Sequence, residues 1–154
     1  MEAGCPIKPR SLLSLKPITM ATFQKFNGFV EALAEKKHNL GSDQIKVALT
    51  NTAPVAGNAV LADLTEITYT NLSARDVTTT SSEQTAGTYK LVLEDLTLTA
   101  TGGSVGPFRY VVLYNDTAAN KDLIGRYDRG AAITLADGES LLIDFDAANA
   151  LTLV

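Results

Sequence analysis

The chain has 154 residues, of which 45% are hydrophobic and 19% charged, and its formal net charge is −4. This length predicts one domain whose hydrophobic core can stabilise the fold without disulfide bonds or a structural metal ion. The single cysteine excludes an intramolecular disulfide framework, and the single histidine argues against a His-rich metal site or a Ser-His-Asp triad. The negative net charge predicts that the protein does not bind nucleic acid. The lack of long apolar runs predicts that it does not span a membrane.

Residues 1–19 differ in composition from the rest. They hold three of the five prolines and a net charge of +2, which leaves about −6 for residues 20–154 (−4 minus +2). Proline favours an extended segment. Two interpretations remain: an upstream extension before a start at Met20, or a basic N-terminal arm that reaches a neighbouring subunit. Cys5 is expected to be an unpaired thiol without a role.

Residues 21–40 are predicted to form one amphipathic helix. Apolar residues recur at spacings of three and four, namely Phe23, Phe26, Val30, Leu33 and Ala34. Thr22 is the expected N-cap and Gly41 the residue that ends the helix. Phe29 lies beside this stripe and is expected to widen the buried face or contact a partner. His38 is interpreted as a solvated cation in the last turn.

After Gly41 the apolar period changes from 3.6 to 2, which is typical of strands. Strands are expected at residues 45–50, 64–70, 75–80, 88–101, 108–114, 123–127, 131–135, 140–145 and 151–154, with a loop at 81–87. A change of parity near Glu94 suggests a bulge or corner within residues 88–101. The 18 threonines are also typical of a β-sheet with one solvent-exposed face. The predicted fold is mainly β: an antiparallel, jelly-roll-like β-sandwich over residues 20–154 with the one N-terminal helix.

The sequence offers little for chemistry, and we expect no enzyme, no catalytic residue and no cofactor. It lacks the nucleophile-elbow, phosphate-loop and paired-cysteine motifs. Asp144 and Asp146 are two residues apart and are therefore expected on one strand face. They are weak candidates for two ligands of a Ca²⁺ site. The simpler interpretation is that both carboxylates lie on the solvent-exposed face of a half-buried strand.

A local concentration of tyrosine and arginine predicts an interaction surface, because these residue types are enriched at interfaces. The alternative is cross-strand pairing within one sheet. The interface candidates, with those of the helix, are Phe26, Phe29, Val30, Leu33, Arg109, Tyr110, Tyr114, Arg126, Tyr127 and Arg129.

Two stretches resemble small virion proteins of tailed bacteriophages: MATFQKFNGFVEALAEKKHNLGSDQIKVALTNTAPV (residues 20–55) and GPFRYVVLYNDTAANKDLIGRYDRGAAITLADGESLLIDF (residues 106–145). The resemblance implies a head decoration (cement) protein on the capsid surface, which binds the major capsid protein and itself, as a trimer, and stabilises the expanded head. It supplies no catalytic residue. A tail- or fibre-associated structural protein and a surface glycan-binding β-sandwich are the alternatives.

Overall fold

The structure is a computed structural model that describes residues 16–17, 22–145 and 151–154. It is mainly β with antiparallel sheets, as predicted. The largest sheet has five strands, each antiparallel to its neighbours. In spatial order they are β2 (Gln24–Lys25), β9 (Leu123–Leu135), β8 (Val105–Asn115), β3 (Ile45–Thr50) and β4 (Asp76–Val77).

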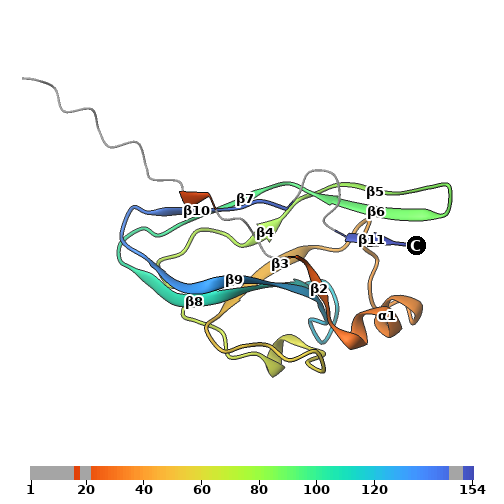
Figure 1. Ribbon diagram of the computed structural model, residues 1–154, viewed down its shortest axis with the longest axis horizontal. Coiled ribbons are helices and arrows are strands. Elements are labelled where there is room, and N and C mark those ends of the chain that lie inside the picture. Colours follow the sequence, from red (N-terminus) through yellow and green to blue (C-terminus); the bar gives the residue numbers. More distant parts are fainter. Residues whose placement is uncertain (1–15, 18–21, 146–150) are drawn as a thin grey trace, which may run out of the picture.

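Two three-stranded sheets lie opposite the five-stranded sheet and together form a second layer (Figure 1). One contains β1 (Lys16–Pro17), β10 (Ser140–Ile143) and β7 (Leu96–Thr99). The other contains β11 (Leu151–Leu153), β6 (Thr88–Leu93) and β5 (Thr79–Thr85). All pairs in this layer are antiparallel except β1 with β10, which is parallel.

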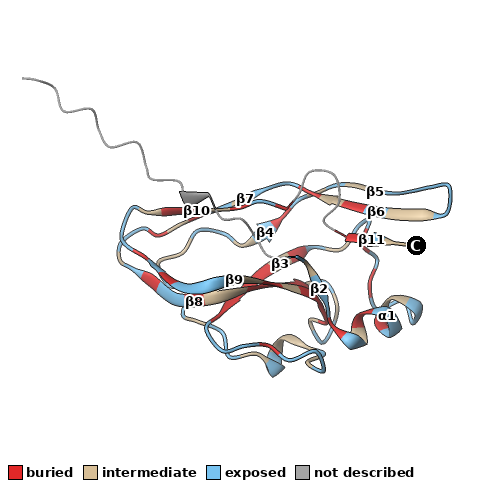
Figure 2. Cartoon of the chain, viewed as in Figure 1, coloured by how far each residue is buried: buried red, intermediate tan, exposed pale blue. Residues whose placement is uncertain are grey.

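The main core lies between the two layers. The alternation predicted for β3 is confirmed, since Ile45, Val47 and Leu49 are fully buried in this core. Leu98 of β7 and Leu141 of β10 belong to the same cluster from the opposite layer. Figure 2 shows buried residues on strands of both layers. Burying these apolar side chains is the main source of stability, at about 1.5–3 kcal/mol for each large one.

The five-stranded sheet is also covered on its outer face. A second cluster of five buried residues lies there: Phe26, Ala48, Val112, Tyr114 and Leu123. Leu61 and Leu64, from the connection between β3 and β4, pack against it. Residues 111–115 of β8 are therefore buried without alternation, as expected of a strand covered on both faces.

Several strand predictions are corrected. Residues 64–70 do not form a strand; within them Glu66 makes an isolated bridge to Thr50, and a 3₁₀ turn (Leu61–Asp63) precedes them. The predicted loop at 81–87 is wrong, because β5 and β6 form a hairpin whose turn is Ala86-Gly87, both with positive φ. The predicted break near Glu94 is confirmed, since it separates β6 from β7. Residues 123–135 form one strand rather than two.

The helix α1 (Asn27–Ala34) has only eight residues and lies inside the longer range predicted. Its buried residues are Phe29 and Ala32, whereas Val30 of the predicted stripe is 55% exposed. Phe26 is the N-cap residue instead of Thr22, and residues 24–25 are in β2 because they pair with β9. Among the described residues, no helix is long and apolar enough to cross a membrane.

Candidate functional site

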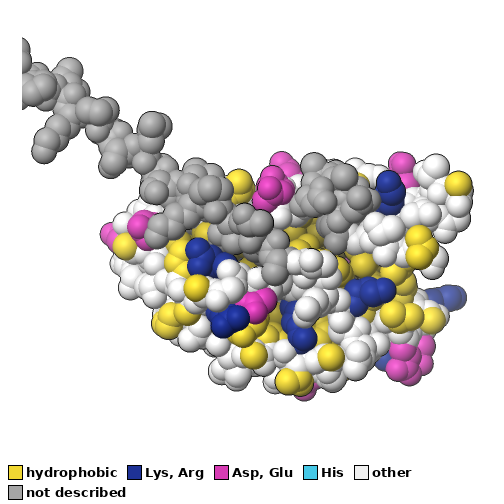
Figure 3. Space-filling view, in the orientation of Figure 1, with side chains coloured by type: hydrophobic (Ala, Val, Ile, Leu, Met, Phe, Trp, Pro, Cys, Tyr) yellow, Lys and Arg dark blue, Asp and Glu magenta, His cyan; other side chains and the backbone are white. Residues whose placement is uncertain are grey.

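The predicted Tyr/Arg concentration maps to the hairpin of β8 and β9. Register places Tyr110 opposite Asp128 and Val112 opposite Arg126, on the face of the sheet turned away from the main core. Arg109 and Arg129 are also partly exposed. We define the arginine surface as Arg109, Tyr110, Arg126, Asp128 and Arg129. Figure 3 shows Lys and Arg side chains, with hydrophobic ones between them, over the part of the molecule where these strands run.

Arg109 and Asp128 form a two-pronged ion pair across the two strands. The Nε of Arg109 donates to Oδ1 at 2.7 Å and Nη2 donates to Oδ2 at 2.8 Å, the fork geometry of a strong charge-assisted pair. These hydrogen bonds, together with one from the Gly130 amide, lower the pKa of Asp128 to about 2. The carboxylate is therefore ionised at neutral pH. The cross-strand interpretation applies to this arginine.

Arg126 connects three segments instead of facing solvent freely. Its Nη1 donates to the carbonyl of Pro54, its Nε donates to Oε1 of Gln24 at 3.3 Å, and its guanidinium lies 5.4 Å from the Phe26 ring centroid. Arg126 thus positions β2 and the β3–β4 connection against β9. Arg129 donates from Nη1 to the carbonyl of Ala131 at 3.1 Å.

Four of the ten predicted interface residues are part of the chain's own interior: Phe26 (1% exposed), Phe29 (0%), Tyr114 (2%) and Tyr127 (6%). They are removed from the candidate surface because a buried side chain has no area left for a partner. Tyr127 points into the main core, where its ring contacts those of Phe23 and Phe145. Val30 is exposed on α1, and Leu33 is half-buried there.

The carboxylate pair is not supported as a strand pair. β10 ends at Ile143, so Asp144 lies beyond the strand, and it is exposed. Asp146 lies outside the described residues. Within the described part of the chain, no group of three or more His, Cys, Asp or Glu side chains is arranged to hold a metal ion.

His38 is not the solvated cation predicted from sequence. It is 5% exposed, its ring lies 5.3 Å from that of Phe29, and its Nδ1 is 3.2 Å from Nδ2 of Asn115. As the Asn115 amide donates to Nδ1, the neutral ring carries its proton on Nε2. Within the described residues, Nε2 has no hydrogen-bond partner. Burial lowers the pKa of His38 and outweighs the opposing charges of Asp122 and Asp43.

Asn115, which directly follows the strand predicted over residues 108–114, is the centre of this network and is fully buried. Its Nδ2 donates to Oδ2 of Asp43 at 2.6 Å, and its Oδ1 accepts hydrogen bonds from the amides of Thr117 and Ala118. In the sequence, the available signal was a polar residue placed directly after the apolar run at residues 111–114 (VVLY).

A pH dependence follows from His38. Its pKa is depressed in the folded state, so below about pH 6.5 the unfolded chain binds the proton more readily and stability falls. Urea unfolding should give a lower free energy of unfolding at pH 5.5 than at pH 7, and His38→Gln should show a smaller difference. Asp128 does not contribute in this window, because its carboxylate stays ionised until far lower pH. An equal pH difference in both proteins would contradict this assignment.

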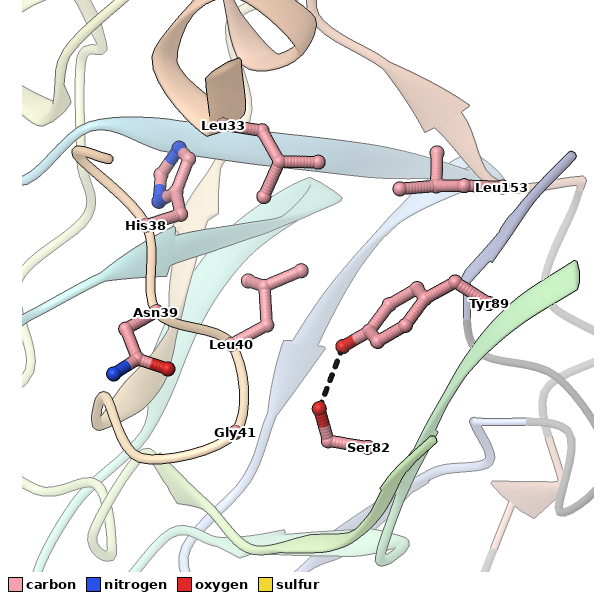
Figure 4. A pocket seen from close by; sticks show the side chains of 8 residues that line it. All are labelled: Leu33, His38, Asn39, Leu40, Gly41, Ser82, Tyr89 and Leu153. Carbon is pink, nitrogen blue, oxygen red and sulfur yellow. Dashed lines mark hydrogen bonds between the residues drawn. The ribbon is translucent and has the colours of Figure 1, made fainter. Parts of the chain in front are cut away.

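A groove of about 600 Å³ opens beside His38 (Figure 4). Its lining comes from four segments: Leu33, His38, Asn39, Leu40, Gly41, Ser82, Tyr89 and Leu153. The hydroxyls of Ser82 and Tyr89 are hydrogen-bonded at 2.8 Å on one side, and His38 lies on the other. We call it the α1–β6 groove. Sequence reasoning missed it because its walls are up to 120 residues apart (Leu33 to Leu153).

Comparisons of this chain with protein-family models, with curated proteins and with solved structures found no match.

Proposed function

We propose that this chain is a non-enzymatic structural protein of a bacteriophage virion: a decoration (cement) protein that binds between major capsid proteins on the capsid surface and stabilises the expanded head. It acts by adding buried contact area between neighbouring subunits, since binding to the expanded form alone shifts the equilibrium toward that form. In this proposal it works as a homo-oligomer, a trimer at local threefold axes, and uses no cofactor.

One observation carries the proposal. The two stretches that resemble phage virion proteins are separated by fifty residues, yet they fold against each other. Residues 20–55 contribute β2, α1 and β3, and residues 106–145 contribute most of β8 together with β9 and β10. β2 pairs with β9 and β3 pairs with β8. The resemblance therefore falls mainly on one folded unit, the five-stranded sheet, which also carries the arginine surface.

The proposal extends to the finer fold, a jelly-roll-like β-sandwich. The two layers that face each other across one core support a sandwich. The chain passes from the five-stranded sheet to the other layer after β4, returns after β7 and leaves again after β9. Such exchange of successive strands between layers is typical of jelly rolls.

The test is binding to capsids. Purified protein should co-sediment with expanded capsids and not with immature ones, and a cryo-EM map of the intact particle should show its density on the head. Density at the tail or fibre would support the tail-associated alternative and overturn the decoration role. Capsids without density attributable to this chain would overturn both.

The arginine surface provides the matching mutational prediction. Tyr110→Ala with Arg129→Ala should weaken capsid binding about 30-fold, the effect of losing an interface hot spot of about 2 kcal/mol. Both side chains are partly exposed, so the unfolding midpoint should change little. Binding is measured by co-sedimentation over a concentration series.

Lys90→Ala is the control, because Lys90 is exposed on β6 in the opposite layer. It should bind like the unmodified protein. Unchanged binding of the double variant would remove the arginine surface from the proposed contact without excluding another face.

A further inference from the structure

The α1–β3 connection (residues 35–44) is attached to the domain by two buried side chains. His38 is 5% exposed and Leu40 is 4% exposed, whereas its other residues are exposed except for the half-buried Asp43. Figure 4 shows the side chains of His38 and Leu40 on one side of this segment and that of Asn39 on the other. A segment with so few buried contacts opens at a lower free energy than the strands of the core. Loss of the His38 contact therefore removes one of its two attachments.

The pocket around His38 accepts only the neutral ring. Within the described residues, Nδ1 lies 3.2 Å from Nδ2 of Asn115, which donates to it, and Nε2 has no partner. The amide of Asn115 is fixed in this orientation, because its oxygen accepts hydrogen bonds from the amides of Thr117 and Ala118. A protonated imidazole carries a hydrogen on both nitrogens. One of them would face the amide hydrogens of Asn115, and the other would be buried without an acceptor, which is costly.

The charged groups near the ring do not remove this conflict. Asp122, which precedes β9, and Asp43 favour the protonated ring, whereas Lys37 disfavours it. The helix α1 contributes the uncharged ring of Phe29, whose centroid is 5.3 Å from that of His38. Burial outweighs the two carboxylates and lowers the pKa of His38. Within the described residues neither carboxylate is hydrogen-bonded to the ring, so neither supplies the acceptor that protonation requires.

We propose that the α1–β3 connection is an acid-sensitive switch, in which protonation of His38 moves its ring out of the core and opens residues 35–44 while the two layers stay folded. Opening uncovers the side of the Phe29 ring that His38 contacts. It also releases the left-handed backbone of Lys36 (φ 63°), which is unfavourable for a residue with a Cβ. The switch is a property of the single chain and does not rest on the proposed capsid role.

The size of the pH response follows from proton linkage. A solvent-exposed histidine has a pKa of about 6.5, so the open segment takes up a proton as the pH falls through this value, whereas the closed segment does not. The equilibrium constant for opening therefore increases as the pH falls. Between pH 7.0 and pH 5.5 the increase is at most about eightfold, the limit for a ring that binds no proton while it is buried.

Amide hydrogen exchange followed by NMR tests this switch in the unmodified protein. The amides of Asn39 and Asp43 are hydrogen-bonded within the connection, to Oδ2 of Asp43 and to the carbonyl of Asn39 respectively. After correction for the intrinsic pH dependence of exchange, their protection should be about three- to eightfold lower at pH 5.5 than at pH 7.0. Low concentrations of urea should leave their exchange unchanged, because local opening exposes little surface.

Val47 in β3 is the internal control for local opening. Its amide donates to the carbonyl of Arg75 at 3.0 Å and its side chain is fully buried, so its exchange requires unfolding of the sheet. It should be better protected than Asn39 and Asp43 at both pH values. Its exchange should accelerate with urea, because unfolding of the sheet exposes a large surface.

Two variants test whether the response belongs to His38. His38→Gln keeps an acceptor for the Asn115 amide and has no group that titrates between pH 5.5 and pH 7, so the pH difference at Asn39 and Asp43 should vanish. Glu35→Gln is the matched control, because it removes an exposed carboxylate from the same connection. It should keep the pH difference of the unmodified protein.

Three results would overturn the proposal: equal protection of Asn39 and Asp43 at the two pH values, exchange of these amides with the same urea dependence as Val47, or a pH difference that persists in His38→Gln. The first two are measured on the unmodified protein, so they decide the question even where His38→Gln does not fold. Capsid co-sedimentation is scored separately, and its outcome does not bear on the switch.

Discussion

Replacing Phe29 by alanine is expected to lower the free energy of unfolding by about 3–5 kcal/mol, the range for deleting a fully buried aromatic ring and leaving a cavity. Phe29 is 0% exposed, belongs to the main core and lies against the ring of His38. Its position on α1 attaches the helix to the sheets. Urea or guanidinium unfolding followed by circular dichroism measures the change.

The adjacent residue is the matched control. Val30 is 55% exposed, so Val30→Ala should change the free energy of unfolding by no more than about 0.5 kcal/mol. The pair also tests which face of the helix is buried. The stripe predicted from sequence places Val30 in the buried face, with Phe29 beside it, either widening that face or contacting a partner. A larger loss for Val30→Ala than for Phe29→Ala would contradict the structure.

Replacing Asn115 by leucine is expected to lower the free energy of unfolding by about 3 kcal/mol or more, even though leucine is similar in size. The substitution removes the hydrogen bonds to Asp43, His38 and the amides of Thr117 and Ala118 at once. Each polar group left buried without a partner costs about 1–3 kcal/mol. The loss is read from the unfolding midpoint in denaturant at pH 7.

Asn120→Leu is the control for this prediction, because Asn120 is exposed in the loop between β8 and β9. It should stay within about 0.5 kcal/mol of the unmodified protein. His38 offers an independent readout in the Asn115 variant: its ring loses the amide donor at Nδ1, so its NMR chemical shifts should change. Unchanged stability and unchanged His38 shifts would remove Asn115 from the centre of the network.

The strands were largely predictable where every second residue is apolar and faces the main core. Ile45–Thr50 and Ser140–Ile143 alternate in sequence and are buried on the predicted face. β5 was missed because both of its faces are largely exposed at the edge of the molecule, so TTSSEQT has no apolar alternation to detect. Its pairing with β6 and the Ala86-Gly87 turn define it instead.

The candidate site was less predictable. Sequence identified the right hairpin for the arginine surface, because Tyr and Arg gather on adjacent strands, but it could not tell which residues face outward. Tyr114 and Tyr127 are buried for different reasons: one under the β3–β4 connection, the other in the main core. The α1–β6 groove is assembled from segments that local patterns treat separately.

The sequence by itself determined a β-rich chain with antiparallel sheets, because the period-2 apolar pattern is a property of each strand alone. Only the tertiary structure decided which face of α1 is buried, that His38 and Asn115 are interior, and where a groove opens. The physical reason is that burial depends on what another segment covers. Whether Val30 or Phe29 is covered, and whether a polar side chain finds partners inside, depends on sheets formed by residues up to a hundred positions away.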